Sequence, residues 1–169
     1  MAIGFYGGEP LLKYKLIQQC VTYAQNTIKE KDLNFAMTTN LVLMTKEKAQ
    51  YFADIDNFII TASLDGPEDI HDEFRKFPDG TGSFSKAIQG LKNLVEAYKD
   101  RVATNIFINM VTEGPNYEEK YKKINDFFST TEWLPKDISI SNSYVTHGVE
   151  ETAYTGIYGA TDQGISKID

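Results

Sequence analysis

The stretch AIGFYGGEPLLKYKLIQQCV, residues 2–21, contains a short apolar run, a glycine-rich turn and the beginning of an amphipathic pattern. Residues 2–6 predict a strand, and apolar residues recur at helical spacing from about Leu11 to Glu30. The residues expected on the inner face of this helix are Leu12, Leu16, Cys20, Val21, Ala24 and Ile28. A strand that leads through Gly-Gly into a helix is typical of a βα unit.

The same alternation recurs along the rest of the chain. Further strands are predicted at LNFAMTT (33–39), NFIITASL (57–64), VATNIFINMVT (102–112) and DISISNSYV (137–145). Between them we expect a short helix capped by Thr45, a clear helix over 84–98 and a helix capped by Asn116. On the helix over 84–98 the residues expected to face the core are Phe84, Ala87, Ile88, Leu91, Leu94, Val95 and Tyr98. On the helix capped by Asn116 they are Tyr117, Tyr121, Ile124, Phe127 and Phe128. The pattern predicts an α/β fold of parallel βα units, in either a doubly wound sheet or a partial barrel.

Composition is typical of a single globular domain and excludes several classes of protein. The chain has 169 residues, of which 41% are hydrophobic and 24% charged, so it can bury a sizeable core. No apolar stretch approaches the roughly 18 residues that a membrane helix needs. A net charge of −7, with scattered basic residues, disfavours broad nucleic-acid binding. We expect one core over residues 1–145 and a polar, glycine-rich tail over 146–169.

Polar residues and glycines follow the predicted strands. In parallel βα folds ligands collect at the carboxyl ends of the strands, which here read YGGEP, TTN, SLDGP and VTEGP. Each motif alone is ordinary turn chemistry, but their recurrence at successive strands favours a ligand site. Glycine lets the backbone approach a ligand closely, and carboxylates and hydroxyls can bind an ammonium group or ribose hydroxyls. The candidate residues are Gly7, Gly8, Glu9, Thr39, Asn40, Ser63 and Asp65.

Cysteine and histidine often have catalytic or metal-binding roles, but here we expect Cys20 and His71 to have structural roles. The one cysteine of the chain, Cys20, lies on the predicted apolar face of its helix and is expected to be a small buried hydrophobe. One cysteine allows neither an internal disulfide nor a cysteine-based metal site within these residues. His71 has no cysteine or second histidine nearby in the sequence, so we expect a hydrogen-bonded structural histidine and no metal ligand.

Four motifs, in order and spacing, carry a resemblance to a known family. FYGGEPLL, TTN, ASLDGPEDIHDEFRKFPDGTGSF and AIQGLKNL resemble radical S-adenosylmethionine (radical SAM) enzymes over about residues 3–112. The subgroup is that of anaerobic sulfatase-maturating enzymes and ribosomal-peptide maturases, which usually carry a C-terminal cysteine-rich (SPASM-type) cluster domain. The resemblance implies a cytoplasmic enzyme that modifies a side chain of a peptide or protein, either a sulfatase or a ribosomal precursor peptide.

The resemblance also implies roles for the candidate residues. Gly7, Gly8 and Glu9 would bind the amino end of the methionine moiety of S-adenosylmethionine. Ser63 would face its ribose, with Asp65 close by in the cavity. Thr39 and Asn40 would line the same rim. Arg75, in IHDEFR, fits the family pattern, and we expect it to organise a loop and not to be catalytic.

The sequence departs from the family at the cofactor that starts the chemistry. The family's 4Fe–4S cluster is bound by a C-x-x-x-C-x-x-C loop after its first strand, and these residues contain no such loop. The auxiliary-cluster cysteines are missing as well, and TTNL replaces the commoner TTNG. We therefore expect a fragment, about strands 2–6 of a (β/α)6 partial TIM barrel, that is inactive alone. A degenerate, cluster-free binding module derived from the same fold is the alternative. The missing strand would leave an exposed edge that could support a homo-oligomer.

Overall fold

The computed structural model describes residues 1–29, 33–112 and 117–144. The expected cap at Asn116 and the expected tail over 146–169 lie outside the described residues. The five strands are β1 (Ala2–Phe5), β2 (Asn34–Thr39), β3 (Phe58–Ser63), β4 (Ile106–Thr112) and β5 (Ser139–Tyr144). The helices are α1 (Tyr14–Thr27), α2 (Lys46–Ala53), α3 (Glu68–Phe74), α4 (Phe84–Tyr98), α5 (Val102–Asn105) and α6 (Tyr117–Thr130), with 3-10 turns η1 (Pro10–Lys13) and η2 (Lys99–Arg101).

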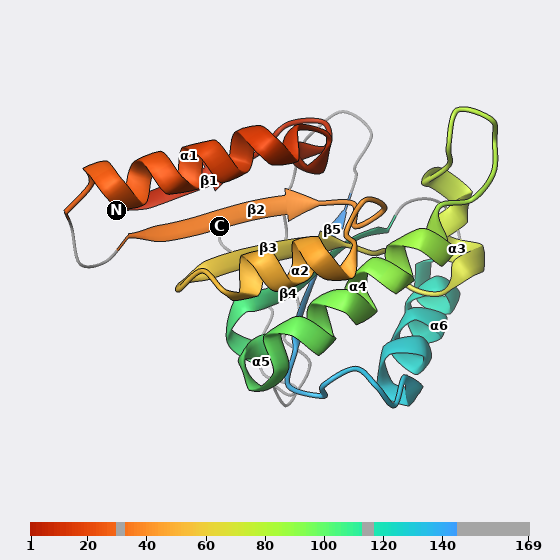
Figure 1. Cartoon of the computed structure of the whole chain (residues 1–169). Helices are drawn as coiled ribbons and strands as arrows, with labels where there is room; N and C mark the ends of the chain where they lie inside the picture. Colours follow the sequence, from red (N-terminus) through yellow and green to blue (C-terminus); the bar gives the residue numbers. More distant parts are fainter. Residues whose placement is uncertain (30–32, 113–116, 145–169) are drawn as a thin grey trace, which may run out of the picture.

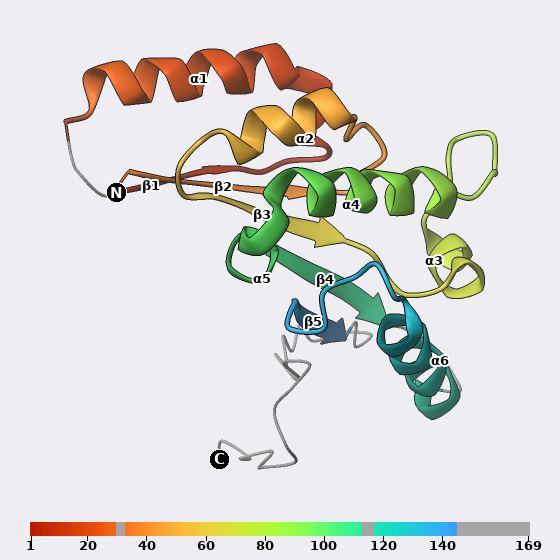
Figure 2. The ribbon, with the colours of Figure 1, turned by 60° about the horizontal axis from the view of Figure 1, so that its bottom comes forward.

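The strands form one parallel sheet in the order β1-β2-β3-β4-β5 (Figure 1). Each strand therefore lies beside the next one along the chain, and all five carboxyl ends lie at one edge. Helices α1, α2 and α4 lie along one face of the sheet (Figure 2). This arrangement confirms the prediction of parallel βα units. Among the described residues β1 pairs with β2 alone, so its outer edge is free.

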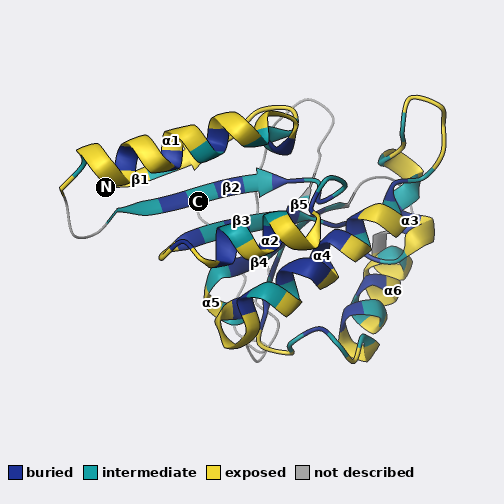
Figure 3. Ribbon diagram, in the orientation of Figure 1, coloured by how far each residue is buried: buried dark blue, intermediate teal, exposed yellow. Residues whose placement is uncertain are grey.

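The core lies between this sheet and its helices. Phe35 and Phe58 are register partners on β2 and β3, and their rings stack with centroids 5.9 Å apart. The ring of Phe52, on α2, packs on that of Phe58 with centroids 4.6 Å apart. The side chains of Phe35, Phe52 and Phe58 are all buried. Alternate strand residues form this buried row, whereas the residues between them are only partly buried (Figure 3). We call the second row the open face; it includes Thr38, Thr61, Ser63, Asn109 and Ser141.

The prediction for α4 is confirmed and that for α1 is partly wrong. Ala87, Leu91, Leu94 and Tyr98 of α4 are buried, as their spacing indicated. On α1 the buried residues are Ile17, Val21 and Ala24. Leu12 and Leu16 are 71% and 55% exposed, and Cys20 is exposed too. Apolar residues recur on two stripes of this helix, and spacing alone could not show which stripe contacts the sheet.

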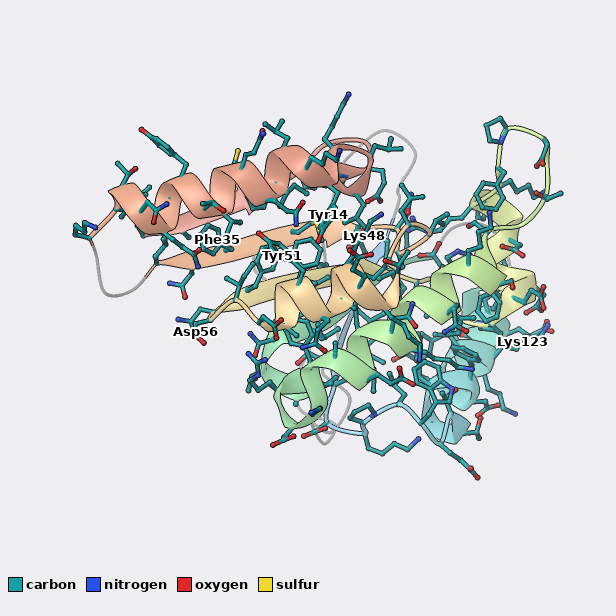
Figure 4. All side chains as sticks on the ribbon, viewed as in Figure 1. Tyr14, Phe35, Lys48, Tyr51, Asp56 and Lys123 are labelled. Atoms are coloured by element: carbon teal, nitrogen blue, oxygen red, sulfur yellow. The ribbon has the colours of Figure 1, made fainter. Side chains whose placement is uncertain are left out.

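Aromatic side chains join α1 to α2. The rings of Tyr14 and Tyr51 meet edge to face with centroids 5.6 Å apart. The ammonium group of Lys48 lies 5.4 Å from the centre of the Tyr14 ring. Figure 4 shows these three side chains together between the two helices. Burial raises the pKa of both tyrosines, so their hydroxyls stay neutral at physiological pH.

The fourth predicted strand begins four residues too early. Residues 102–105, predicted as strand, form the short helix α5, and β4 begins at Ile106. The chain must turn between α4 and β4, and the turn is held by side chains from outside the strand. Arg101 donates to the carbonyl of Ala53, and Asn105 donates to the carbonyl of Phe58. Tertiary contacts here outweigh local β-propensity.

Leu41 occupies the position where TTNL departs from TTNG. Its φ is +67°, in the left-handed region that glycine adopts most easily. A non-glycine residue in this region costs about 1–2 kcal/mol. Complete burial of the leucine side chain offsets that cost by a similar amount. The substitution is therefore compatible with an unchanged turn.

Candidate functional site

Glu9 anchors the glycine-rich loop to the end of the neighbouring strand. Its Oε1 accepts hydrogen bonds from the Leu11 amide at 2.9 Å and from the Thr39 hydroxyl at 2.8 Å. Its Oε2 accepts from the Asn40 amide at 2.8 Å. A carboxylate offers about four acceptor positions, so three are in use and about one is left for a ligand. Thr39 and Asn40 thus hold Glu9, a role that the sequence did not indicate.

Gly7 and Gly8 form the exposed part of this loop, directly after β1. Gly7 has φ +149°, which side-chain-bearing residues rarely adopt. Both glycines are exposed, and a Cβ built on either would meet no atom within 4 Å. The backbone carbonyls of the loop can therefore be approached closely by a ligand, and Glu9 holds the loop in place while they are.

Ser63 ends β3 on the open face. Within the described part of the chain its hydroxyl has no hydrogen-bond partner, so it is available to a ligand. Its register partner is Asn109 of β4. The Asn109 Oδ1 accepts from Ser141 at 2.9 Å and from Ser143 at 3.2 Å. Sequence reasoning missed this polar group, although the alternation in DISISNSYV places its serines on one face.

Asp65 is committed to bonds within the protein. Its side chain is 6% exposed, and its two oxygens accept from Nε and Nη2 of Arg75. Oδ1 also accepts from the amide of Val111, near the end of β4, at 2.9 Å. These bonds support a positioning role for Asp65, and they agree with the loop-organising role expected for Arg75. The bidentate pair joins the loop after β3 to the segment after α3.

His71 is buried between the same two segments, as expected for a structural histidine. Its Nδ1 lies 3.3 Å from the Asp65 amide and its Nε2 lies 3.1 Å from the Ser83 hydroxyl. Burial lowers the pKa of His71, and Arg75 lowers it further, although Asp65 and Asp72 oppose this. The ring is therefore neutral at physiological pH.

The sequence-predicted residues thus form two groups at one edge of the sheet. Glu9 is bonded to Thr39 and Asn40, and Asp65 is bonded to Arg75 and Val111. Thr39 pairs with Ala62, one residue before Ser63, so the two groups lie on adjacent strands. No hydrogen bond joins the groups across residues 1–29, 33–112 and 117–144. A ligand that contacted both would span the ends of β1 to β3.

A comparison with protein families decides the relationship. The sequence profile of the radical SAM superfamily matches residues 2–124. The chain belongs to the radical SAM superfamily.

Curated and solved relatives agree with this assignment. A serine-type anaerobic sulfatase-maturating enzyme of Bacteroides thetaiotaomicron is 30% identical over 91 residues, covering 53% of this chain and 22% of the relative. A cysteine-type enzyme of Clostridium novyi is 28% identical over 126 residues, covering 73% and 32%. The solved structure of anSMEcpe with bound AdoMet and Kp18Cys peptide superposes with a TM-score of 0.69 and 24% identity, covering 83% of this chain and 37% of that one. The radical SAM chain thus spans about a third or less of the curated enzymes, and the structural match shows a shared fold.

The residues of this radical SAM chain do not fit an iron–sulfur cluster. Such clusters are held by several cysteine thiolates, and Cys20 is the chain's one cysteine. It is exposed on α1, away from the strand ends. Across the described ranges no three histidine, cysteine or acidic side chains gather where they could hold a metal ion. The described residues also include no helix long and apolar enough to cross a membrane.

Proposed function

We propose that this chain supplies the S-adenosylmethionine pocket of an enzyme that modifies a side chain of a peptide or protein. The observation that carries the proposal is the anchoring of Glu9 to Thr39 and Asn40. This anchoring leaves the Gly7-Gly8 backbone open and keeps one acceptor position of the carboxylate for the amino group of the methionine moiety. The free Ser63 hydroxyl, at the end of β3, would bind the ribose. Asp65 would hold the loop beside it.

The chemistry of the whole enzyme needs a group that these residues do not bind. When present, a 4Fe–4S cluster supplies the electron that cleaves S-adenosylmethionine in this superfamily. We therefore propose that the 169 residues alone bind the ligand without reacting. A sulfatase or a ribosomal precursor peptide as substrate, a SPASM-type cluster domain and a cytoplasmic location belong to the same proposal. The maturase relatives and the peptide in the solved structure support the substrate class.

Replacing Ser63 tests the pocket. We expect Ser63→Ala to weaken S-adenosylmethionine binding about tenfold, since a ribose hydroxyl would lose its partner in a partly buried site. Isothermal titration calorimetry on the purified chain measures the affinity. Ser85→Ala, at an exposed serine in the first turn of α4 to which we assign no role in the pocket, is the matched control and should bind like the wild type. Equal affinity for wild type and Ser63→Ala would refute the assigned contact.

Iron and sulfide content separates the enzyme from the cluster-free binding module. A longer form of the protein, purified without oxygen, is expected to hold iron and sulfide and to absorb broadly near ~400 nm, whereas the 169 residues should not. If a longer form held no cluster even after reconstitution, the binding module would stand and the radical mechanism would have to be abandoned.

The outer edge of β1, which is unpaired among the described residues, bears on the homo-oligomer prediction. An unpaired edge strand exposes backbone donors and acceptors to a further strand. We expect the isolated chain to form dimers at high concentration, and multi-angle light scattering after size-exclusion chromatography measures the mass. A strictly monomeric chain at all accessible concentrations would contradict this prediction.

A further inference from the structure

His71 is 1% exposed, and its two ring nitrogens are hydrogen-bonded to Asp65 and Ser83. The Ser83 hydroxyl donates its hydrogen to the Arg75 carbonyl at 2.8 Å, so its oxygen accepts a hydrogen bond from the Nε2–H group of His71. Nδ1 of the ring then accepts from the Asp65 amide. These directions leave one consistent tautomer, a neutral ring with its proton on Nε2.

Together with the Asp65–Arg75 ion pair, these hydrogen bonds form a closed cycle of four residues. Asp65 is bound by His71 at its backbone and by Arg75 at its side chain. Arg75 is bound by Asp65 at its guanidinium and by Ser83 at its carbonyl. The four residues therefore fix one another, and each has polar groups satisfied by two of the others. We call Asp65, His71, Ser83 and Arg75 the His71 circuit.

The His71 circuit acts on the residue that faces the ligand. Ser63 lies two residues before Asp65, and Leu64 between them donates its amide to the Asn109 carbonyl at 3.2 Å. On the other side Asp65 holds the Val111 amide. The end of β3 is thus held by β4 and by the circuit together, which fixes the direction of the Ser63 side chain.

We propose that His71 is a positioning residue for S-adenosylmethionine, holding Ser63 in its binding position through the Asp65 backbone. This inference rests on the proposed function. His71 itself touches no ligand; it acts through the amide of Asp65 and through Ser83.

Protonation of His71 would break one hydrogen bond of the His71 circuit. A protonated Nδ1 would face the Asp65 amide, which is also a donor. The charged groups around the ring are Asp65 from the loop after β3, Asp72 on α3 and Arg75 after it, and Phe84 of α4 packs against the ring. The pKa of His71 is lowered by burial, so the change comes at a pH below the usual value near 6.5. Affinity for S-adenosylmethionine should therefore be constant at neutral pH and fall as the pH drops below about 6.5.

Two conservative variants test separately the two hydrogen bonds that the His71 imidazole makes, to the Asp65 amide and to the Ser83 hydroxyl. The amide oxygen of asparagine can take the place of Nδ1, and the amide nitrogen of glutamine can take the place of Nε2. His71→Asn should therefore keep the bond to Asp65 and bind S-adenosylmethionine within about threefold of the wild type. His71→Gln should lose that bond and bind about tenfold more weakly. Asp79→Ala, which disturbs the tip of the same 75–83 loop at Thr81 without touching the circuit, is the control.

Calorimetry with S-adenosylmethionine from pH 7.5 to pH 5 is the experiment, with the melting temperature of each variant measured alongside. The proposal predicts the affinity order wild type, His71→Asn, His71→Gln, and a fall in affinity at low pH that His71→Asn lacks. A residue of purely structural importance would change the melting temperature but not this pH profile. Equal affinity of His71→Gln and wild type, or the same pH profile in both wild type and His71→Asn, would overturn it.

A spectroscopic measurement keeps this result apart from the proposed function. Long-range nitrogen–proton NMR spectra of the imidazole rings should show the Nε2–H tautomer of His71, with the signal of His147 identified by His147→Gln. A different tautomer would overturn the circuit whether or not the ligand binds. Failure of the wild-type chain to bind S-adenosylmethionine, with the Nε2–H tautomer present, would instead refute the proposed function.

Discussion

Asp65→Ala is expected to lower the free energy of unfolding by about 3–5 kcal/mol, the usual cost of removing one partner from a buried ion pair. The Asp65 side chain is 6% exposed and Arg75 is 27% exposed, so water can replace the lost carboxylate only in part. The substitution would leave the Arg75 fork without its acceptor and the Val111 amide without its partner. Urea denaturation at pH 7 measures the change.

An exposed pair in the same protein gives the matched comparison. Lys46 and Glu96 lie 2.8 Å apart with side chains 72% and 66% exposed. Glu96→Ala should therefore cost less than about 1 kcal/mol. Asp65→Asn keeps the shape of the side chain and should fall between the two. A loss for Asp65→Ala no larger than that for Glu96→Ala would show that the buried pair does not hold the loop.

Gly90→Ala is expected to destabilise the protein by about 2 kcal/mol, although alanine is the better helix former. Gly90 is buried in α4, and a Cβ there would lie 2.3 Å from the carbonyl oxygen of Leu41 and 3.0 Å from its Cβ. Alanine would gain about 1 kcal/mol of helix propensity. The collision is with backbone, which cannot rotate away, and overpacking of this kind costs about 1–3 kcal/mol or more. The collision should outweigh the gain.

Ser85→Ala is the control for this second substitution. It introduces alanine at an exposed position of the same helix, where no close neighbour is displaced, and should change stability by less than about 0.5 kcal/mol. Thermal and urea unfolding measure both variants. A stabilised Gly90→Ala protein would mean that α4 and the Leu41 turn can move apart without cost.

Sequence patterns predicted the type and order of the elements better than their boundaries. Strand 57–64 and helix 84–98 were clear, because β-branched residues and apolar spacing agreed there with the packing. The start of β4 was wrong because Arg101 and Asn105 hold a helical turn through bonds to Ala53 and Phe58. Cys20 was misplaced because the orientation of α1 depends on the sheet it contacts.

The candidate site was predicted as a set of residues but not as a network. Strand ends in a parallel sheet must meet, so Glu9, Thr39 and Ser63 could be placed at one edge from the sequence. The hydrogen-bond partners could not be read from the sequence, because the bonds from Glu9 to Thr39 and Asn40 span about thirty residues and the bond from Asp65 to Val111 spans more. Long-range hydrogen bonds leave no periodic signal in the chain.

The sheet order has a consequence for how the chain is made. Because each of β2 to β5 pairs with the strand synthesised just before it, none of these strands has to wait for a distant partner. The sheet can therefore lengthen one strand at a time as the polypeptide leaves the ribosome. Each new βα unit would cover the edge exposed by the previous one, so that during synthesis the growing edge, where unwanted pairing could start, is open only for the time needed to translate one unit.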